Sequence, residues 1–437
     1  MNSQFLLAAA HSGAGKTTVT LGLLRALQRM GLRVQPFKCG PDYIDPIHHR
    51  TAAGTNSINL DRFMMSDAHI RQLYNQYGSA ADVGITEGVM GLFDGAKKRE
   101  GSSADIARLL GLPVILILDA NAMAYSAAAL LYGLKNFDRK LTIAGVIFNF
   151  VDSGSHYRLL CEAAEDVGIR ALGHLPTGDS LRIPSRHLGL DTTDADKAIV
   201  AAADHIEKQI DLAALLAATQ ITPGGAPAIQ AAPTATPSPS PATNKKILVA
   251  YDEAFHFLYA ENIRRLEEYG QVSFFSPIRD RYLPFTPDLL YLPGGYPELY
   301  LPELSGNRSL LDQISAYANA NGPILAECGG MMYLGRDLQD AAGKTWPMAG
   351  VLDIATSIFR KKMTLGYRTV RLGGLVLKGH EFHYSQPLGE YARSAAEVCN
   401  AHGVRIETPV FYNPRLLASY AHFYWGENKD ILQRLLS

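Results

Sequence analysis

The sequence predicts an α/β protein of two domains, each built on a mainly parallel sheet covered by helices. Short β-rich runs alternate with segments of helical periodicity along the chain, a pattern typical of parallel sheets with crossover helices. A Pro- and Ala-rich stretch interrupts this alternation near the middle. The length of 437 residues agrees, because one domain takes about 150 residues. A content of 47% hydrophobic and 19% charged residues indicates a globular protein and excludes a largely disordered one.

Charge and cysteine content exclude several further classes. The chain has 41 basic and 42 acidic residues, so its net charge of -1 offers no general attraction for nucleic acid or an acidic membrane. The four cysteines lack C-x-x-C spacing, which disfavours a disulfide framework or a zinc ribbon. The N-terminus lacks the basic region of a secretory signal, and Asp119 and Asn121 interrupt the apolar stretch 113–134. We therefore expect a cytoplasmic protein without a membrane span.

The predicted domain boundary lies at residues 219–244, with the sequence TQITPGGAPAIQAAPTATPSPSPATN. Pro, Ala, Thr and Ser dominate this stretch, and no charged residue occurs until Lys245. Such a composition buries little apolar surface and favours an extended linker. We expect one domain at 1–218 and a second at 245–437.

The N-terminal domain contains five β-rich runs, at 5–9, 32–37, 81–86, 113–119 and 143–150. A helix is expected after the first run, because Val19, Leu23, Leu27 and Met30 follow one another at spacings of three and four. Strands and helices in this order predict a doubly wound parallel sheet. Ligands bind such sheets at the carboxyl ends of the strands, so the loops after these runs are the candidate sites.

The C-terminal domain repeats the alternation with four β-rich runs, at 245–250, 271–276, 287–293 and 323–327. A helix between the first two runs is indicated by Ile263, Leu266 and Tyr269. This domain is therefore predicted to be α/β as well.

A phosphate-binding loop is predicted at AHSGAGKTT, residues 10–18, between the first strand and the first helix. Gly13 and Gly15 allow backbone amides to point at phosphate oxygens, Lys16 adds a positive charge, and the Thr17 hydroxyl can ligate magnesium. Ala10 stands where the usual pattern begins with glycine. The predicted phosphate-binding residues are Ser12, Gly13, Gly15, Lys16, Thr17 and Thr18.

Carboxylates follow the second and third strands, in KCGPDYIDP and ITEGVMGLFDG. Asp42, Asp45 and Glu87 could hold a magnesium ion that bridges phosphates, because this ion prefers oxygen ligands. Asp42 and Asp45 could instead cap a helix in a Pro-containing turn, and Glu87 could be an exposed loop acid.

Two further segments are candidates for ligand contacts. Asn149 ends the fifth strand, where its amide could bind an adenine edge or form a turn. Arg186 and His187 lie in RIPSRHLGL, which could recognise carboxylates or form a solvated basic surface.

In the C-terminal domain, PILAECGGMMYL predicts a nucleophile elbow at Cys328. A turn from strand to helix would present the thiol at a helix N-terminus, where we expect its pKa to be lowered. His422 is the predicted base, with His380 and His383 as alternatives. Backbone amides of an oxyanion hole are expected at Gly294, Gly295 and Gly329.

Taken in order, SGAGKTTVTLGLLRAL, KCGPDYIDP, EGVMGLFDG, SRHLGL, DEAFHF, LPGGYPELY, AECGGMMYL, LGYR, GHEFHYS and SYAHF resemble the cobyrinate a,c-diamide synthases. The resemblance spans nearly the whole chain outside the linker. It implies a dethiobiotin-synthetase-like ATPase domain joined to a class I glutamine amidotransferase domain of α/β fold. The implied reaction uses ATP, L-glutamine and Mg²⁺ to amidate two acetate side chains of a corrinoid polycarboxylate.

The resemblance also implies roles for particular residues. Lys16 and Thr17 match the phosphate loop, and Cys328 and His422 match the nucleophile and its activator. The remaining matches are the metal and catalytic acids Asp45 and Glu87. The candidates for substrate binding are Asp42, Tyr43, Arg186 and His187. No partner other than small molecules is expected, and a homodimer is left open.

One departure and two alternatives accompany this interpretation. Tyr424 stands where many class I amidotransferases carry a glutamate, so a Cys–His pair is expected rather than a triad. One alternative is a related synthase that acts on hydrogenobyrinate or nickel-sirohydrochlorin. The other is a partitioning ATPase fused to an inactive amidotransferase fold. His11 occupies the position of the signature lysine of partitioning ATPases, which disfavours that class.

Overall fold

The computed structural model describes residues 3–181, 183, 192–221, 244–360, 362–391, 396–428 and 430–437. The chain forms two compact units, Met1–Ala235 and Thr236–Ser437. Most of the predicted linker lies outside the described residues, so the domain limits at 218 and 245 stay a prediction. None of the helices in the described part of the chain has the length and hydropathy needed to cross a membrane.

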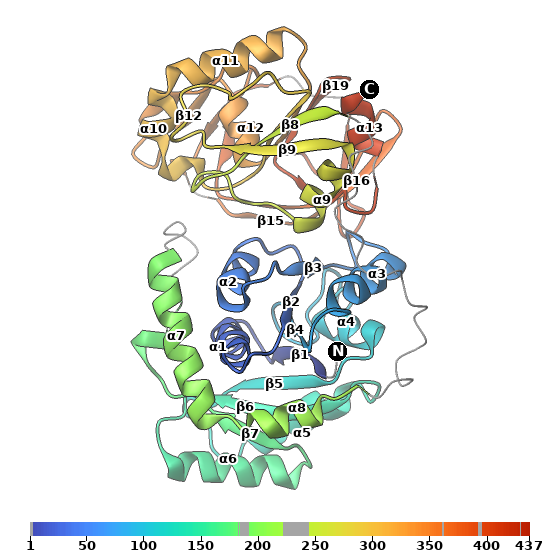
Figure 1. Cartoon of the computed structure of the whole chain (residues 1–437), viewed down its shortest axis with the longest axis vertical. Coiled ribbons are helices and arrows are strands. Elements are labelled where there is room, and N and C mark those ends of the chain that lie inside the picture. The colour runs from blue at the N-terminus through green and yellow to red at the C-terminus, as the bar shows by residue number, and fades with distance from the viewer. Residues whose placement is uncertain are drawn as a thin grey trace. The chain divides into compact units, whose positions relative to one another are not determined.

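Unit 1 is built on a seven-stranded, fully parallel sheet with the strand order β3-β2-β4-β1-β5-β6-β7 (Figure 1). All five predicted strands are present, and two short strands that the sequence analysis missed, β3 and β7, complete the edges. The strands are β1 (Ser3–Ala9), β2 (Val34–Cys39), β3 (Ile58–Leu60), β4 (Val83–Glu87), β5 (Val114–Asp119), β6 (Ile143–Asn149) and β7 (Ala171–His174).

Helices cover both faces of this sheet, as the predicted doubly wound fold requires. Buried residues of α1, α7 and α8 share one apolar core with β1, whereas the strand order places α3 to α6 on the opposite face. The helical segments are α1 (Lys16–Arg29), α2 (Ile44–Ala53), α3 (Asp67–Gly78), α4 (Ser103–Leu110), α5 (Ala127–Phe137), α6 (Gly154–Asp166), the 3₁₀ turn η1 (Asp179–Leu181), α7 (Thr192–Gln209) and α8 (Leu212–Ala218).

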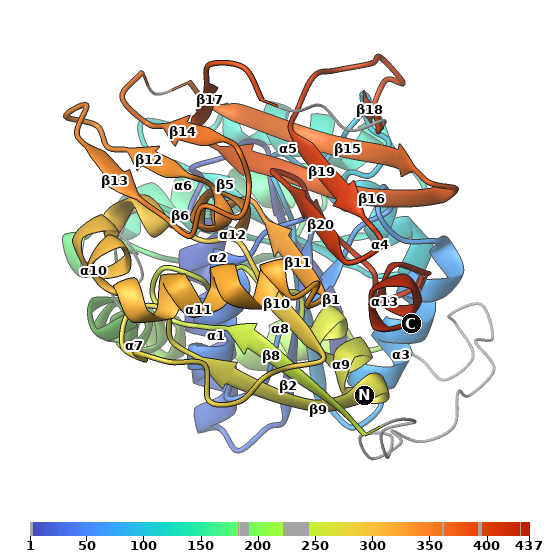
Figure 2. The same ribbon diagram turned by 90° about the horizontal axis from the view of Figure 1, so that it is seen from above.

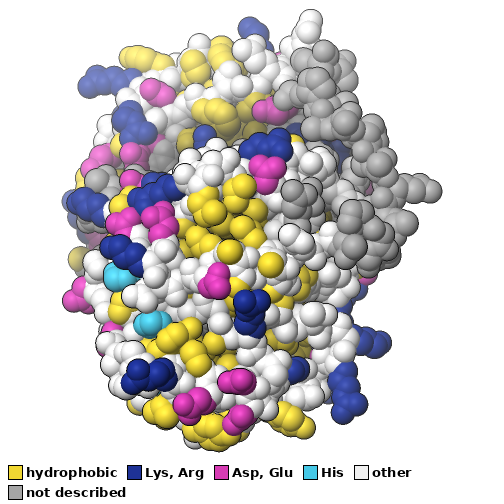
Figure 3. Space-filling view, turned by 60° about the horizontal axis from the view of Figure 1, so that its bottom comes forward, with side chains coloured by type: hydrophobic (Ala, Val, Ile, Leu, Met, Phe, Trp, Pro, Cys, Tyr) yellow, Lys and Arg dark blue, Asp and Glu magenta, His cyan; other side chains and the backbone are white. Residues whose placement is uncertain are grey.

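The predicted apolar stripe of α1 is confirmed except at its end. Val19, Leu23 and Leu27 are fully buried, whereas Met30 is 55% exposed because the helix ends at Arg29. Helix α5 is less covered, since Tyr132 and Phe137 are both more than half exposed. Figure 3 brings this end of unit 1 forward and shows apolar side chains in patches between charged ones.

Unit 2 contains a six-stranded sheet with the order β19-β20-β11-β10-β8-β9, in which only the edge strand β19 is antiparallel (Figure 2). Successive side chains of β8 pack into two different apolar cores. Leu248 packs with α10, α11 and α12, whereas Ile247 packs with α9 and α13. The strands are β8 (Lys245–Ala250), β9 (Gly270–Phe275), β10 (Leu289–Leu292), β11 (Ile324–Glu327), β19 (Val410–Asn413) and β20 (Leu416–Ser419).

The helices of unit 2 include the one predicted from Ile263, Leu266 and Tyr269, which is α9. A six-residue helix follows β11 directly and is α12. The helical segments are α9 (Ala260–Tyr269), the 3₁₀ turn η2 (Pro297–Leu299), α10 (Leu301–Gly306), α11 (Arg308–Asn319), α12 (Gly329–Leu334) and α13 (Asp430–Leu436).

Two additional four-stranded sheets, which the sequence analysis did not predict, complete unit 2. Their orders are β13-β12-β14-β17 and β18-β15-β16-β21, and the second contains a long antiparallel pair. The strands are β12 (Asp337–Gln339), β13 (Thr345–Pro347), β14 (Ala355–Ser357), β15 (Thr364–Leu372), β16 (Leu375–His383), β17 (Gln386–Leu388), β18 (Glu397–Asn400) and β21 (His422–Phe423).

Candidate functional site

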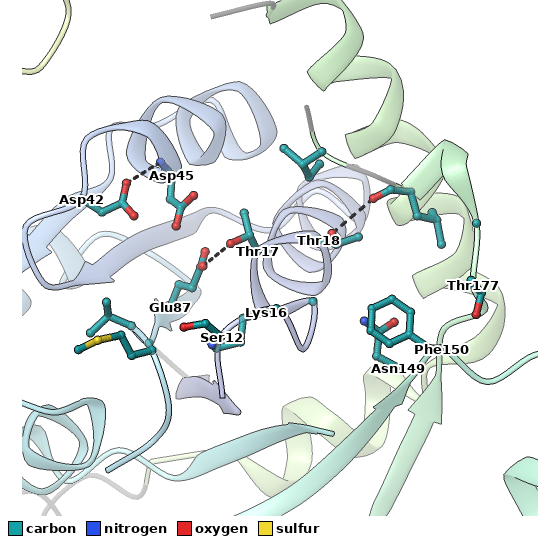
Figure 4. Close-up of a pocket in the computed structure, with 18 of the residues that line it drawn as sticks. Ser12, Lys16, Thr17, Thr18, Asp42, Asp45, Glu87, Asn149, Phe150 and Thr177 are labelled. Carbon is teal, nitrogen blue, oxygen red and sulfur yellow. Dashed lines mark hydrogen bonds between the residues drawn. The ribbon is translucent and has the colours of Figure 1, made fainter. Parts of the chain in front are cut away.

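A cavity of about 790 Å³ lies at the carboxyl ends of the parallel strands of unit 1 (Figure 4). Loops after β1, β2, β4 and β6 contribute to it, in agreement with the expected position of a ligand in this fold. The predicted candidates among its lining residues are Ser12, Gly13, Gly15, Lys16, Thr17, Thr18, Asp42, Asp45, Glu87 and Asn149.

The glycines of the phosphate loop are required by the backbone. Gly13 and Gly15 have φ values of 86° and 87°, in the left-handed region that favours glycine. A Cβ on Gly15 would lie 2.0 Å from Nδ2 of Asn149, so no larger residue fits there. Helix α1 begins at Lys16, and its first amides are therefore available for an anion.

Among the described residues, no carboxylate lies at hydrogen-bond distance from Lys16, and its Nζ donates to the carbonyl of His11 at 3.1 Å. Burial, followed by repulsion from the Lys38 ammonium, lowers the pKa of Lys16. An anion placed in the cavity would relieve this repulsion. The arrangement thus favours a phosphate beside Lys16.

A compact ionic cluster lies next to the loop. Lys38 Nζ is 2.6 Å from Asp45 Oδ2 and 2.9 Å from Glu87 Oε1, and the side chains of all three residues are almost completely buried. Thr17 Oγ1 donates to Glu87 Oε1 at 2.8 Å (Figure 4). The cluster joins the carboxyl ends of β2 and β4 to the N-termini of α1 and α2.

The pKa shifts in this cluster follow from competition between burial and charge. For Glu87, burial alone would raise the pKa, but the Lys38 ammonium and the His49 hydrogen bond outweigh it, and the pKa is lowered. For Lys38, burial opposes the charge, but Asp45 and Glu87 raise its pKa well above the ordinary value. Glu87 is therefore an ionised, buried carboxylate, not the exposed loop acid of the alternative interpretation.

Lys38 and His49 were missed by the sequence analysis. Lys38 could have been found as a charged residue inside the apolar strand β2. His49 Nε2 donates to Glu87 Oε2 at 2.7 Å, because the ionised carboxylate can only accept, and His49 follows Asp45 at a spacing of four on α2. Residues four apart share one face of a helix, which is the signal that could have identified it.

The other unit 1 candidates differ in their positions. Asp42 lines the cavity, yet its Oδ1 also accepts the backbone amides of Ile44 and Asp45 at 2.9 and 3.1 Å, as the helix-cap alternative predicts. Tyr43 is buried and is not among the described lining residues. Arg186 and His187 lie outside the described residues, so their roles stay predictions.

Asn149 acts locally on the phosphate loop. Its Nδ2 donates to the carbonyl of Ala14 at 3.0 Å, and the side chain is buried. The neighbouring Phe150 lines the cavity with a φ of 63°, a strained value for an aromatic residue. Contact of Asn149 with an adenine edge stays a prediction.

In unit 2, Cys328 forms a strained turn between β11 and α12. Its φ and ψ are 46° and -105°, and its amide donates to the carbonyl of Ser419 at 2.7 Å. The thiol is 3% exposed, and burial, followed by the negative charges of Glu298 and Glu381, raises its pKa well above the ordinary value. The expected lowering of the thiol pKa is therefore wrong for this arrangement. Desolvation outweighs the amides of a six-residue helix.

The loop after β10 lies against both His422 and the turn that follows Cys328. A Cβ on Gly294 would lie 2.1 Å from Cε1 of His422, and a Cβ on Gly329 would lie 3.2 Å from the amide nitrogen of Gly295. The predicted oxyanion glycines therefore lie together between the elbow and the histidine. His422 is fully buried, and burial, followed by His380 and His383, lowers its pKa to about 3.

The alternative histidines lie on the neighbouring strand. His380 faces His422 across the antiparallel β16–β21 pair, and burial lowers its pKa to about 4. His383 stacks on Tyr420 with ring centroids 3.9 Å apart. The Cys328 Sγ lies 3.9 Å from the carbonyl of Phe382, so β16 passes beside the thiol as well.

Glu327, directly before the elbow, was also missed by the sequence analysis. Its Oε1 accepts the amide of Phe423 at 2.9 Å, and its Oε2 accepts the hydroxyl of Tyr291 at 2.8 Å. Burial raises the pKa of Glu327 to about 8 because both donors are neutral. This carboxyl connects the Cys328 turn to the strand that carries His422.

Within the part of the chain that the structure describes, the unit 1 cavity is the candidate site for a metal ion. Thr17, Asp45 and Glu87 supply oxygen atoms of the kind that Mg²⁺ binds. Among the described residues, no group of three or more His, Cys, Asp and Glu is arranged to hold an ion by itself. Magnesium sites at phosphates commonly take few protein ligands and complete their coordination with phosphate and water, so these residues fit that ion.

Comparison with known proteins gives two domain matches. Residues 5–190 match the CobQ/CobB/MinD/ParA nucleotide binding domain. Residues 246–430 match the CobB/CobQ-like glutamine amidotransferase domain. The two matches fall on opposite sides of the Pro-rich stretch.

Several curated relatives match nearly the whole chain. The cobyrinate a,c-diamide synthase of Caldanaerobacter subterraneus subsp. tengcongensis is 38% identical over 99% of this chain and 97% of the relative. The enzyme of the same name from Syntrophotalea carbinolica is 40% identical over 97% and 95%. The hydrogenobyrinate a,c-diamide synthase of Brucella suis is 43% identical over 88% of this chain and 90% of the relative.

Proposed function

Because this chain belongs to the cobyrinate and hydrogenobyrinate a,c-diamide synthase family, we propose that it amidates the a and c acetate carboxylates of cobyrinic acid in cobalamin biosynthesis. It is a carbon–nitrogen ligase that uses ATP for activation and glutamine as nitrogen donor. The observation that carries this function is the presence, in one chain, of a phosphate loop beside buried carboxylates and of a cysteine elbow beside a histidine.

The ATP-dependent half-reaction is assigned to unit 1. A bare carboxylate has no adequate leaving group, so the substrate carboxylate first attacks the γ-phosphorus of ATP, and ADP leaves. The product is an acyl phosphate, which ammonia then attacks with departure of phosphate. Lys16 and the α1 amides offset the charge on the transferring phosphoryl group. Asp45 and Glu87 are the acids that we assign to this step.

We assign magnesium binding to the same cavity. Thr17, Asp45 and Glu87 would hold the ion, which would offset the negative charge of the ATP phosphates. In the present arrangement Lys38 occupies the region between the two carboxylates. The Lys38 ammonium thus helps to lower the pKa of Glu87 in the absence of other cations.

The glutaminase half-reaction is assigned to unit 2. The Cys328 thiolate attacks the side-chain amide of glutamine, ammonia leaves, and water hydrolyses the resulting thioester to glutamate. His422 takes the thiol proton and returns it to the leaving nitrogen. Backbone amides at Gly295 and Gly329 are the candidate oxyanion donors, since these residues lie next to each other.

The metal content of the tetrapyrrole is the open part of the substrate assignment. Relatives named for cobyrinate and for hydrogenobyrinate match this chain at comparable identity. We propose cobyrinic acid first, with hydrogenobyrinate as the alternative. We also propose a cytoplasmic location, where ATP and glutamine are available, and leave a homodimer open.

The deciding experiment is a product assay with the purified full chain, ATP, Mg²⁺, glutamine and each candidate tetrapyrrole. Mass spectrometry should show two successive conversions of a carboxylate to an amide on cobyrinic acid. ATP hydrolysis without any amidated tetrapyrrole would instead support the partitioning-ATPase alternative.

A further inference from the structure

The buried side of Glu87 carries a short hydrogen-bonded chain of two side chains. His49 Nε2 lies 2.7 Å from Glu87 Oε2, and His49 Nδ1 lies 3.0 Å from the hydroxyl of Ser57. His49 is fully buried, Ser57 is 4% exposed, and neither is among the described residues that line the cavity. They therefore approach the carboxylate from the protein side rather than from the ligand side.

The two oxygens of Glu87 have different partners. Oε1 is shared by Lys38 and Thr17, both of which line the cavity and stand beside the phosphate loop. Among the described residues, His49 is the hydrogen-bond partner of Oε2. A ligand that draws Lys38 or Thr17 away from Oε1 would leave the contact with His49 intact.

Helix α2 makes this arrangement possible. Asp45 and His49 are four residues apart and face the same centre, Asp45 toward Lys38 and His49 toward Glu87. Ser57 immediately precedes β3, which pairs with β2, the strand that carries Lys38. The contact with Ser57 restricts rotation of the imidazole ring, as outer hydrogen bonds do for functional histidines.

We propose that His49, oriented by Ser57, is a positioning residue that fixes the Glu87 carboxylate for activation of the substrate carboxylate. The proposal rests on the proposed function, because it requires Glu87 to act in the ATP-dependent half-reaction. His49 touches neither ATP nor substrate. It would hold the Glu87 side chain in one rotamer while Oε1 exchanges Lys38 or Thr17 for a ligand.

The test compares two substitutions of His49 in the full-length protein. His49→Gln keeps an N–H donor close to the position of Nε2, whereas His49→Leu removes it. With ammonium as nitrogen donor, kcat should fall about 10–100-fold in His49→Leu, in the range found for residues that orient functional ligands. His49→Gln should recover most of that loss. KM for ATP should stay near the wild-type value in both variants.

Two additional measurements separate positioning from general damage. Affinity for ADP without divalent cation, measured by calorimetry, should be unchanged, since the phosphate loop is not altered. Glutaminase activity should be unchanged as well, because unit 2 is untouched. His69→Gln is the matched control, since His69 is a buried histidine on α3 outside the residues that line the cavity.

Ser57→Ala keeps the proposal testable even if His49→Leu does not fold. Because Ser57 acts through His49, Ser57→Ala should reduce kcat in the wild-type background and have little further effect in His49→Gln. Equal effects of Ser57→Ala in both backgrounds would overturn the proposal, as would a His49→Gln variant no better than His49→Leu. The wild-type product assay is the separate test of the proposed function.

Discussion

Backbone strain at single residues coincides with the candidate sites. Of the six described non-glycine residues with positive φ, Met90 and Phe150 line the unit 1 cavity and Cys328 is the predicted nucleophile. Such conformations cost about 1–3 kcal/mol each and persist only where the surroundings enforce them. For Cys328, the enforcing contact is the hydrogen bond that its backbone amide donates to the carbonyl of Ser419 on the adjacent strand. The residue type suggests a nucleophile, and the turn determines where the thiol lies.

Glu327 is predicted to make the stability of the protein depend on pH. Its pKa is about 8 in the folded state, above the ordinary value of 4.5, so the folded carboxyl keeps a proton that the unfolded chain loses. This contribution to stability is complete below pH 4.5 and is lost as the pH rises through 8, by about 1.4 kcal/mol per pH unit in between. Glu327→Gln stays neutral and should remove this slope from denaturant titrations between pH 5 and 8.

The control for this experiment is Glu303→Gln, which changes an exposed glutamate of α10 and should leave the pH slope as in the wild type. An undiminished slope in Glu327→Gln would show that this carboxyl is already ionised in the folded protein.

Glu87→Gln should impair synthesis far more than glutamine hydrolysis. Glu87 is ionised and accepts hydrogen bonds from Thr17, Lys38 and His49. A glutamine amide has a single acceptor oxygen and no negative charge, so it cannot replace all three contacts. We expect at least a ~10²-fold loss of kcat with ammonium as donor, in the range of general acid–base contributions. The measurement is the rate of ammonium-dependent synthesis and the rate of glutamine hydrolysis in the same variant. A wild-type rate of synthesis in Glu87→Gln would show that Glu87 is not a functional residue.

At the scale of elements, the turn after β10 packs closely against the histidine of the glutaminase site. A Cβ on Gly294 would lie 2.1 Å from the imidazole of His422, far closer than real side-chain contacts. Gly294→Ala should therefore displace His422 and abolish most glutaminase activity, while ammonium-dependent synthesis continues. Steady-state glutamate release is the measurement.

Gly306→Ala at the end of α10 provides the matched control, because nothing lies within 4 Å of its Cβ position. It should have wild-type glutaminase activity and slightly higher stability, by about 0.4–1 kcal/mol, through the lower entropy of its unfolded chain. A fully active Gly294→Ala variant would mean that the loop and His422 are apart during catalysis.

At the scale of the whole molecule, the two units should be separable in function, with ammonia as the shared intermediate. Cys328→Ser should abolish glutamine-dependent amidation, since an alcohol is a far weaker nucleophile at neutral pH. Ammonium salts should restore synthesis, because the thiol and the phosphate loop belong to different units. Mass spectrometry of the tetrapyrrole follows both reactions.

Lys16→Ala is the complementary change. It should eliminate product with either nitrogen donor, because the γ-phosphoryl group loses a positive charge during transfer. Glutaminase activity should survive in it. A Cys328→Ser protein that still uses glutamine at the wild-type rate would show that the cysteine is structural and would refute the assignment of the glutaminase site.

Sequence patterns alone determined the parallel cores of both units, the phosphate loop and the cysteine elbow. These features depend on local causes, namely hydrophobic periodicity, glycine at left-handed positions and the change from strand to helix. The strands β12 to β18 were not predicted, because many are short and half exposed. In addition, β14 pairs with the distant strand β17.

Only the tertiary structure decided which polar groups contact one another and which protonation state each group favours. Lys38, His49 and Glu87 come from three different elements, and Glu327 meets an amide 96 residues away. The same is true of the Cys328 thiol, whose raised pKa reflects burial among segments brought together by folding, not the helix that follows it. Local sequence specifies backbone conformation, whereas desolvation and charge pairing depend on every segment that packs around a group.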